Sequence, residues 1–236
     1  MRNLLAIMVA FLFGSAAIAQ VPAPPVVTPA ATPENILYLD LSTGGKVAIQ
    51  LRPDMAPGHV ARVKMLVRRG FYDGLVFHRV IEGFMAQGGD PKGSGEGGSE
   101  LPDLKAEFNA LPHLRGSVSM ARAENPDTAN SQFFIMFAPR MSLDGRYTVF
   151  GRVIGGMQFV DAITRGEGDN GKVEANATRI VKASIAGDVP GAVPASPLVP
   201  GGQLISAPAA PAKATLPVVA AKPAPVPAKK VRKKRR

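Results

Sequence analysis

Three polar side chains with hydrogen-bonding ends stand inside apolar stretches of this sequence. Arg79 and Gln87 belong to FHRVIEGFMAQGGD (77–90), and Gln132 belongs to SQFFIMF (131–137). A guanidinium and two amides can hold the carbonyl and N–H groups of a ligand, while the neighbouring apolar side chains enclose its carbon skeleton. An apolar pocket with a few polar groups aimed into it is the usual construction of a ligand site. The two stretches are therefore the first candidates for function.

Both stretches are expected to be strands, whose side chains alternate between the two faces. In the first, a turn at Glu82–Gly83 precedes Phe84–Gln87, which places Met85 and Gln87 on one face and Phe84 and Ala86 on the other. In the second, the residues expected to share a face are Gln132, Phe134 and Met136. This spacing lets each strand present one glutamine beside bulky apolar groups.

The elements that must position these strands are short. An alternating hairpin is predicted over 37–51, with its turn at 42–45. A helix is predicted to begin at Pro57 and to end at Gly70, because 60, 63, 66 and 67 are apolar with helical spacing. Further strands are expected between 111 and 137, at 147–153 and at 180–185, with a second helix over 156–164. Many short strands with two helices favour an antiparallel barrel capped by helices.

Composition divides the 236 residues unevenly. All 18 acidic residues lie between Glu34 and Asp188, where they are matched by 18 basic residues, whereas 189–236 holds nine Lys or Arg and no acid. The net charge of +10 therefore belongs to the ends of the chain and not to its centre. Cysteine is absent, which excludes disulfides, thiol catalysis and cysteine-based zinc sites.

The two ends are predicted to lie outside the folded domain of residues 34–188. Residues 1–19 have the pattern of a secretory signal peptide, with Arg2, an apolar run over 4–13 and Ala17-Ile18-Ala19 as the cleavage site. An uncleaved anchor is the alternative, although about 20 apolar residues are needed to span a bilayer. Residues 20–33 are a Pro-rich spacer, and 189–236 is a Pro- and Ala-rich tail expected to be disordered. A periplasmic or secreted location follows from this interpretation.

Four blocks of this sequence resemble the signatures of cyclophilin-type peptidyl-prolyl isomerases, in that family's order and spacing. They are FYDGLVFHRVIEGFMAQGGDP (71–91), GSVSMARA (116–123), SQFFI (131–135) and LDGRYTVFGRV (143–153). The resemblance covers about two thirds of the chain. It implies a closed eight-stranded antiparallel β-barrel with one α-helix over each end. It also implies rotation of X–Pro bonds in proline-containing polypeptides, with no cofactor and no metal.

The resemblance further implies a role for each matching residue. Arg79 would donate to the substrate carbonyl and the amide nitrogen, and Gln87 would orient Arg79. The proline pocket would consist of Phe84, Met85, Phe134 and Leu143. The groove for the preceding residues would be lined by Ala121, Arg122 and Gln132, with Tyr147, where many members have histidine, at its rim.

Simpler interpretations stand beside these roles. Arg79 could pair with an acid such as Glu82, and the apolar residues could all be core. His78 is expected to pack inside the barrel, and His59 and His113 are interpreted as isolated, which makes a metal site improbable. The glycines at 93, 95 and 98 match G-x-G-x-x-G, but no strand–helix context for a dinucleotide surrounds them. The alternative function is a module or chaperone that binds proline segments without turnover.

The basic end of the tail has three interpretations. It could attach the chain to an anionic envelope surface, it could bind nucleic acid, which an export signal disfavours, or it could be solvated without a partner. The charges concerned are Lys229, Lys230, Arg232, Lys233, Lys234, Arg235 and Arg236. No nucleic acid is therefore expected as a partner, and the domain is expected to be a monomer.

Overall fold

The computed structural model describes residues 31–188 of the chain. The expected signal peptide, most of the Pro-rich spacer and the basic tail lie outside these residues. Neither helix within 31–188 has the length and apolar character needed to cross a bilayer.

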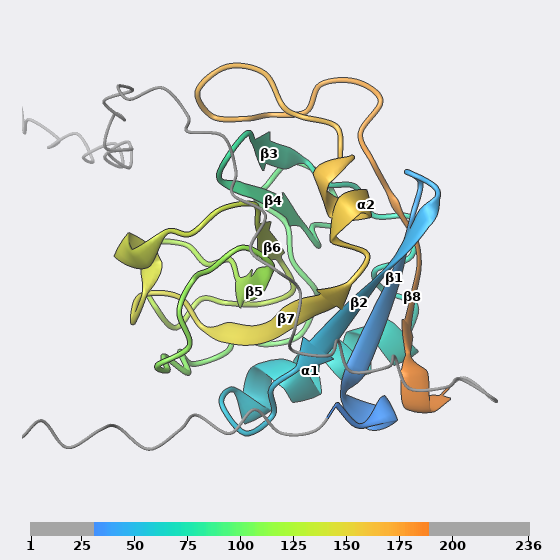
Figure 1. Cartoon of the computed structure of the whole chain (residues 1–236). Helices are drawn as coiled ribbons and strands as arrows, with labels where there is room; N and C mark the ends of the chain where they lie inside the picture. Colours follow the sequence, from blue (N-terminus) through green and yellow to red (C-terminus); the bar gives the residue numbers. More distant parts are fainter. Residues whose placement is uncertain (1–30, 189–236) are drawn as a thin grey trace, which may run out of the picture. The chain divides into compact units, whose positions relative to one another are not determined.

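Eight strands form one curled sheet (Figure 1), in the order β3-β4-β6-β5-β7-β2-β1-β8. Every pair of neighbours is antiparallel. The strands are β1 (Ile36–Leu41), β2 (Gly45–Leu51), β3 (Arg79–Ile81), β4 (Met85–Gly88), β5 (Ser117–Met120), β6 (Phe133–Met136), β7 (Val149–Gly155) and β8 (Ile180–Ile185). The predicted class, mostly β with eight antiparallel strands and two helices, is confirmed.

The expectation of a fully closed barrel goes too far. The outermost strands β3 and β8 do not pair with each other. The segment before β3 meets the start of β8 through the bridge between Val76 and Arg179 and three backbone hydrogen bonds between 74–77 and 178–180. The outer edge of β3 pairs instead with a loop, because the Val80 N–H donates to the Gly171 carbonyl at 2.7 Å and the Gly166 N–H donates to the Val80 carbonyl at 2.9 Å. The sheet is therefore a half-barrel whose open edge is covered by the loop.

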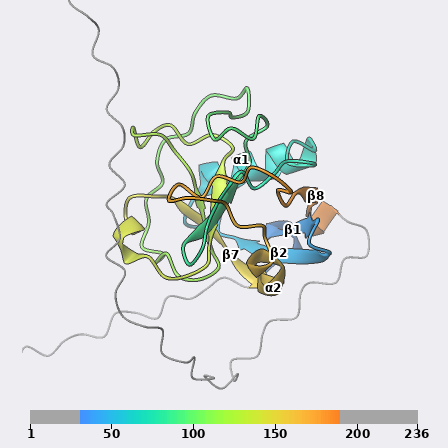
Figure 2. The same ribbon diagram turned by 90° about the horizontal axis from the view of Figure 1, so that it is seen from above.

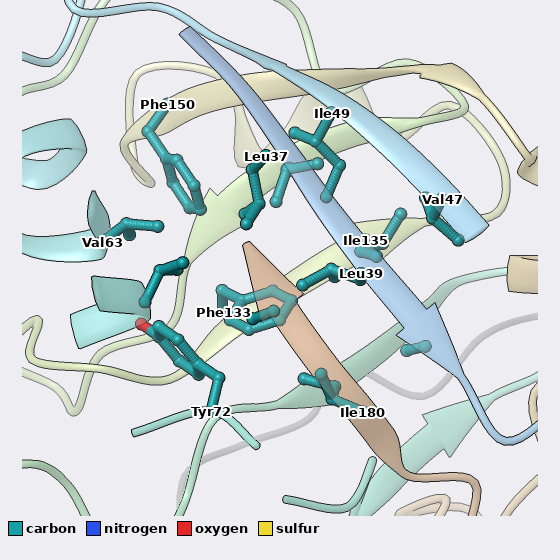
Figure 3. Packing of buried hydrophobic residues seen from close by; sticks show 14 of the residues in the cluster. Leu37, Leu39, Val47, Ile49, Val63, Tyr72, Phe133, Ile135, Phe150 and Ile180 are labelled. Carbon is teal, nitrogen blue, oxygen red and sulfur yellow. The ribbon is translucent and has the colours of Figure 1, made fainter. Parts of the chain in front are cut away.

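The hairpin β1–β2 follows from its sequence alternation. Leu37, Leu39 and Leu41 are all buried, and the strands meet in the register that pairs Leu39 with Val47. Their side chains join Phe133 and Ile135 of β6 and Phe150 of β7 in the main core (Figure 3). The predicted hairpin and the strand at 180–185 are confirmed at their expected positions.

Helix α1 (Pro57–Arg68) begins at its proline and buries the four apolar residues predicted from helical spacing. It ends in a Schellman motif, because the Gly70 N–H bonds the Val67 carbonyl and the Phe71 N–H bonds the Leu66 carbonyl. Gly70 has φ +68°, a left-handed conformation that glycine adopts without a steric penalty. The helix end predicted at this glycine is therefore confirmed.

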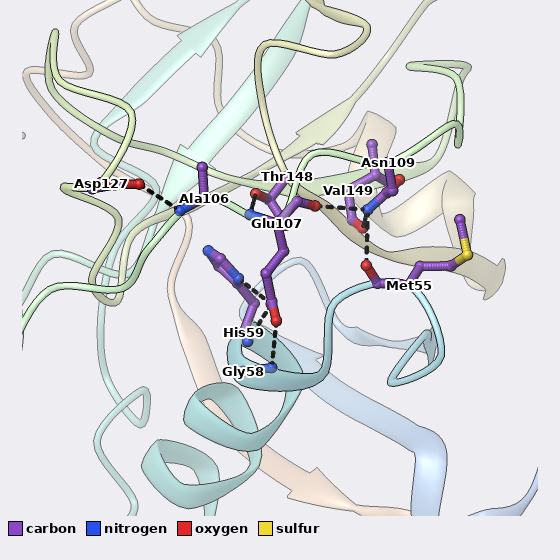
Figure 4. A network of polar contacts seen from close by, with 9 residues as sticks. All are labelled: Met55, Gly58, His59, Ala106, Glu107, Asn109, Asp127, Thr148 and Val149. Atoms are coloured by element: carbon purple, nitrogen blue, oxygen red, sulfur yellow. Dashed lines mark hydrogen bonds and ion pairs between the residues drawn. The ribbon is translucent and has the colours of Figure 1, made fainter.

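The start of α1 is capped from a distance. Ala56 precedes the helix and has no side-chain acceptor, and the carboxylate of Glu107 accepts instead from the N–H groups of Gly58 (2.9 Å) and His59 (3.0 Å). The same carboxylate meets the His59 ring, and the Asn109 amide ties the segment to the Met55 and Val149 carbonyls (Figure 4). The interpretation of His59 as isolated is therefore wrong.

Helix α2 (Met157–Asp161) is shorter than the predicted 156–164. Its Phe159 ring packs directly on Gly45 of β2, where a Cβ atom would overlap the ring. Val160 and Ile163 are buried as expected, but Ile163 lies beyond the helix end. The element is therefore little more than one turn long. Seen from above (Figure 2), α1 and α2 lie on opposite sides of β1 and β2.

Candidate active site

Arg79 and Gln87 face each other across the β3–β4 hairpin. The turn over 82–84, with Gly83 at φ +66°, sets the register that pairs these two residues directly. Arg79 Nη1 donates to Gln87 Oε1 at 3.2 Å. The eight-residue separation in the sequence thus becomes a cross-strand contact of about 5 Å between backbones.

A hydrogen-bond relay continues from Gln87 into the glycine-rich loop. Gln87 Nε2 donates to Gln132 Oε1 at 2.9 Å, and Gln132 Nε2 donates to the carbonyls of Gly95 (3.0 Å) and Gly97 (2.7 Å). Each amide accepts on one side and donates on the other, which fixes the orientation of both. Gln87 therefore presents its oxygen to Arg79.

The second anchor of Arg79 is a main-chain group. Arg79 Nε donates to the Asn170 carbonyl at 2.9 Å, so the guanidinium is held between β4 and the loop that covers the edge of β3. Burial lowers the pKa of Arg79, but from an ordinary value so far above neutrality that the group keeps its charge. Glu82, the acid considered for Arg79, pairs instead with Arg165.

An apolar cluster separate from the main core lies beside this arginine. Met85, Phe134 and Met136 are its buried members, and β4 and β6 pair so that Met85 faces Met136 and Gln87 faces Phe134. The half-buried members are Ile81, Phe84, Ala121, Leu143 and Tyr147. All four residues predicted for the proline pocket therefore come together.

The predicted alternation fails at one position. Ala86 packs in the main core and Met85 in the second cluster, as expected, but Phe84 joins Met85 and not Ala86. Phe84 lies in the turn before β4 begins, where the two-residue period does not apply. Its ring is covered by the Arg140 guanidinium at 4.9 Å.

The residues predicted for the groove line a hollow of about 560 Å³ next to Gln87. Ala121, Arg122 and Gln132 form one part of it, and the glycine-rich loop 95–98 forms another. Arg122 donates to the carbonyls of Ala123, Glu124 and Arg146 and lies over the Tyr147 ring at 4.6 Å. Its guanidinium thus braces the backbone of the groove and the ring at its rim.

The glycine-rich loop is organised by a buried carboxylate and not by a phosphate-binding helix. Asp90 is 1% exposed and accepts from the N–H groups of Lys92, Ser94 and Gly95. These bonds outweigh burial and lower the Asp90 pKa. The dinucleotide interpretation of this loop therefore finds no strand–helix unit around it. Among residues 31–188, no three His, Cys, Asp or Glu side chains gather in a way that could hold a metal ion.

The family comparison decides how this site is assigned. The sequence profile described as "Cyclophilin type peptidyl-prolyl cis-trans isomerase/CLD" matches residues 38–185. The chain belongs to the cyclophilin family. The match begins within β1, includes the six strands between, and ends at the last residue of β8.

Similar proteins from two bacteria are named peptidyl-prolyl cis-trans isomerases. A probable peptidyl-prolyl cis-trans isomerase from Brucella suis is 53% identical over 171 residues, which cover 67% of this chain and 86% of the relative. Peptidyl-prolyl cis-trans isomerase B from Bacillus subtilis is 46% identical over 132 residues, covering 55% of this chain and 91% of the relative.

Solved cyclophilin structures share the fold. The crystal structure of cyclophilin AquaCyp293 from Hirschia baltica has a TM-score of 0.60 at 28% identity, covering 67% of this chain and 76% of that one. A cyclophilin from Cryptosporidium parvum, crystallised in the presence of the dipeptide Ala-Pro, has a TM-score of 0.59 at 29% identity, covering 64% and 98%.

Two residues of this cyclophilin site were not identified from the sequence. Asn170 acts through its carbonyl, which leaves no side-chain signal. His113, interpreted as isolated, is fully buried, bonds Asp144 and stacks on Phe134. The position of His113, three residues before the block that begins at Gly116, could have drawn attention to it. Its partner could not be identified in this way, because Asp144 is 31 positions away. His78 is buried, as predicted, and burial lowers its pKa.

Proposed function

We propose that this cyclophilin catalyses cis–trans isomerisation of X–Pro bonds, with Arg79 as the donor that stabilises the twisted amide. The barrier to rotation is about 18–20 kcal/mol because amide resonance must be lost. The uncatalysed process takes tens to hundreds of seconds. The proline nitrogen becomes a hydrogen-bond acceptor only when the amide twists, so a fixed donor beside it favours the transition state over the ground state.

The observation that carries this proposal is the placement of Arg79. Two acceptors hold its guanidinium, Gln87 Oε1 and the Asn170 carbonyl, and within residues 31–188 its third nitrogen, Nη2, has no partner. Gln87, which holds the guanidinium, pairs across β4 and β6 with Phe134 of the apolar cluster that would receive the proline ring. A preorganised donor of this kind costs no rearrangement during the reaction.

The binding module without turnover is the competing proposal. Such a module needs the apolar cluster and the hollow lined by Ala121 and Gln132, but it has no need of a buried relay that fixes one arginine. The chain of bonds from Arg79 through Gln87 to Gln132 therefore favours the enzyme.

The decisive experiment measures the cis-to-trans rate of a short X–Pro peptide with the full chain and with Arg79→Ala. We expect kcat/KM to fall by roughly two to three orders of magnitude, which is the usual effect of removing one transition-state donor. Arg152→Ala removes an exposed arginine from β7 as a matched control and should leave the rate unchanged. Equal rates for the wild type and Arg79→Ala would refute the role of Arg79. Peptide binding without acceleration in the wild type would favour the binding module.

We also propose that the substrates are exported proteins. The signal-like segment 1–19 supports a periplasmic or secreted location, and the seven basic residues from Lys229 to Arg236 support attachment to an anionic envelope surface. Cell fractionation with sequencing of the mature N-terminus tests the first point, with Gln20 expected as the first residue. A chain that retains Met1 in the cytoplasm would overturn it. Loss of binding to anionic vesicles when 229–236 is removed tests the second.

A further inference from the structure

Two histidines of this chain share the same local design. In His59 the backbone N–H and ring Nδ1 both meet one oxygen of Glu107, and in His113 both meet one oxygen of Asp144, each at 2.8 Å. Both side chains are 0% exposed. In both rings Nε2 is buried and has no hydrogen-bond partner among residues 31–188. A carboxylate accepts only, so Nδ1 is the donor in each pair, and the bond holds each ring in one orientation.

The two histidines differ in what their rings touch. His59 lies in the first turn of α1 and does not belong to the apolar cluster beside Arg79. His113 stacks on Phe134 with 17° between the rings and 6.2 Å between their centroids. It also meets the edge of Tyr147 at 6.5 Å, and Phe134 and Tyr147 meet edge to face at 5.6 Å. Three rings therefore form one packed unit, in which Phe134 belongs to the expected proline pocket and Tyr147 to the rim of the expected groove.

His113 also holds the segment that supplies another wall of the pocket. Its ring and N–H bind Asp144, which follows Leu143 directly, and its carbonyl accepts from the Arg140 N–H at 2.8 Å. Within the segment 140–144 the backbone hydrogen bonds are local, and they run from the Leu143 N–H to the Arg140 carbonyl and from the Asp144 N–H to the Met141 carbonyl. His113 therefore grips the segment 140–144 at both ends.

We propose that His113, oriented by Asp144, is a positioning residue that sets the shape of the proline pocket through Phe134, Leu143 and Tyr147. The inference rests on the proposed function, because it gives this cluster the task of holding the proline ring. His113 makes no bond to Arg79, Gln87 or Gln132. The pocket grips the proline ring equally in the ground state and in the transition state, so its shape controls affinity, whereas Arg79 controls the chemical step.

The test is the substitution His113→Asn, compared with His59→Asn in the full chain. In both variants the asparagine amide can still donate to the carboxylate, but the ring is lost from a fully buried position. The aromatic pairs of His113 with Phe134 and Tyr147 hold the wall of the pocket in place, and losing both should weaken peptide binding roughly tenfold. We expect His113→Asn to raise KM and the Kd for an Ala-Pro-containing peptide about tenfold, with kcat within about twofold of the wild type. His59→Asn should lower the melting temperature and leave both constants unchanged.

Three results would overturn the inference: unchanged KM and Kd in His113→Asn, an equal increase in His59→Asn, or a fall in kcat at unchanged KM. If His113→Asn does not fold, Asp144→Ala carries the test, because this carboxylate is 36% exposed and its removal frees the ring without leaving a buried cavity. That variant should raise Kd severalfold, and an unchanged Kd would again overturn the inference. Affinity is measured separately from turnover, so an inactive wild type that binds the peptide would refute the proposed function alone.

Discussion

Adding one methyl group at Gly171 should impair catalysis without touching a catalytic residue. Gly171 has φ +66°, and a Cβ atom there would lie 2.8 Å from the Val80 carbonyl oxygen and would overlap the Ile81 side chain. The loop would have to move away from β3, and the adjacent Asn170 carbonyl would move away from Arg79 Nε. Gly168 is the matched control, because it has φ +64° and its added Cβ would meet only Asn170 Oδ1, at 3.9 Å.

Both substitutions place an alanine in a left-handed backbone conformation, but only Gly171→Ala also creates a steric overlap. A left-handed conformation costs an L-residue about 1–2 kcal/mol, so Gly168→Ala should lower the free energy of unfolding by that amount and keep full activity. Gly171→Ala adds overpacking, about 1–3 kcal/mol more. A hydrogen bond to a charged group contributes about 1.5–3 kcal/mol, so partial loss of the Asn170 bond should lower kcat/KM roughly tenfold.

Urea unfolding and the X–Pro isomerisation rate of the same preparations provide the two measurements. The expected pattern is a loss of stability in both variants and a loss of kcat/KM in Gly171→Ala alone. Full activity in a destabilised Gly171→Ala protein would show that the loop does not position Arg79. Equal loss of activity in Gly168→Ala would show that the effect is not specific to the contact with β3.

Two further predictions concern stability. Burial opposes ionisation of Glu107, but bonds from the His59 ring and from the Gly58 and His59 N–H groups lower its pKa overall, below the ordinary 4.5. The stabilisation by the Glu107 carboxylate is therefore complete above about pH 5 and is lost as the pH falls through the lowered pKa of the folded state. The difference in unfolding free energy between the wild type and Glu107→Gln, measured by urea unfolding, should therefore shrink in acid. A difference that stays constant with pH would contradict this. The buried hydroxyl of Tyr72 donates to the Ser131 carbonyl at 3.0 Å. Tyr72→Phe should therefore lower the free energy of unfolding by about 0.5–1.5 kcal/mol. An unchanged urea midpoint would count against a contribution from that bond.

The two histidine–carboxylate pairs have the same local geometry but different roles. His59 and Glu107 fasten the start of α1 to the segment that precedes β5, which is a matter of stability. His113 and Asp144 fasten the segment beside the apolar cluster, which is a matter of pocket shape. Neither role is visible in the histidine itself. The two roles differ because Phe134 and Tyr147 pack against the ring of His113, whereas neither packs against the ring of His59.

The sequence by itself determined the elements whose signals are local. The β1–β2 hairpin, α1 and β8 were predicted because alternation, helical spacing and a terminal glycine act within a few residues. The link between Gln87 and Arg79 was implied by the family resemblance, and the structure pairs these two residues across the short turn between β3 and β4. The roles of the pocket residues were implied by family resemblance, and they remain predictions for mutagenesis.

The tertiary structure alone decided the contacts that join distant parts of the chain. The Asn170 carbonyl reaches Arg79 across 91 positions, and a main-chain acceptor has no side chain by which a sequence could reveal it. The contacts of the His113 ring with Phe134 and Asp144 depend on the packing of three separate segments. The contact of Phe159 with Gly45 and the pairing of the edge of β3 with a loop likewise join residues that are far apart in the sequence. Local pattern specifies which elements form, whereas packing between elements specifies which atoms meet.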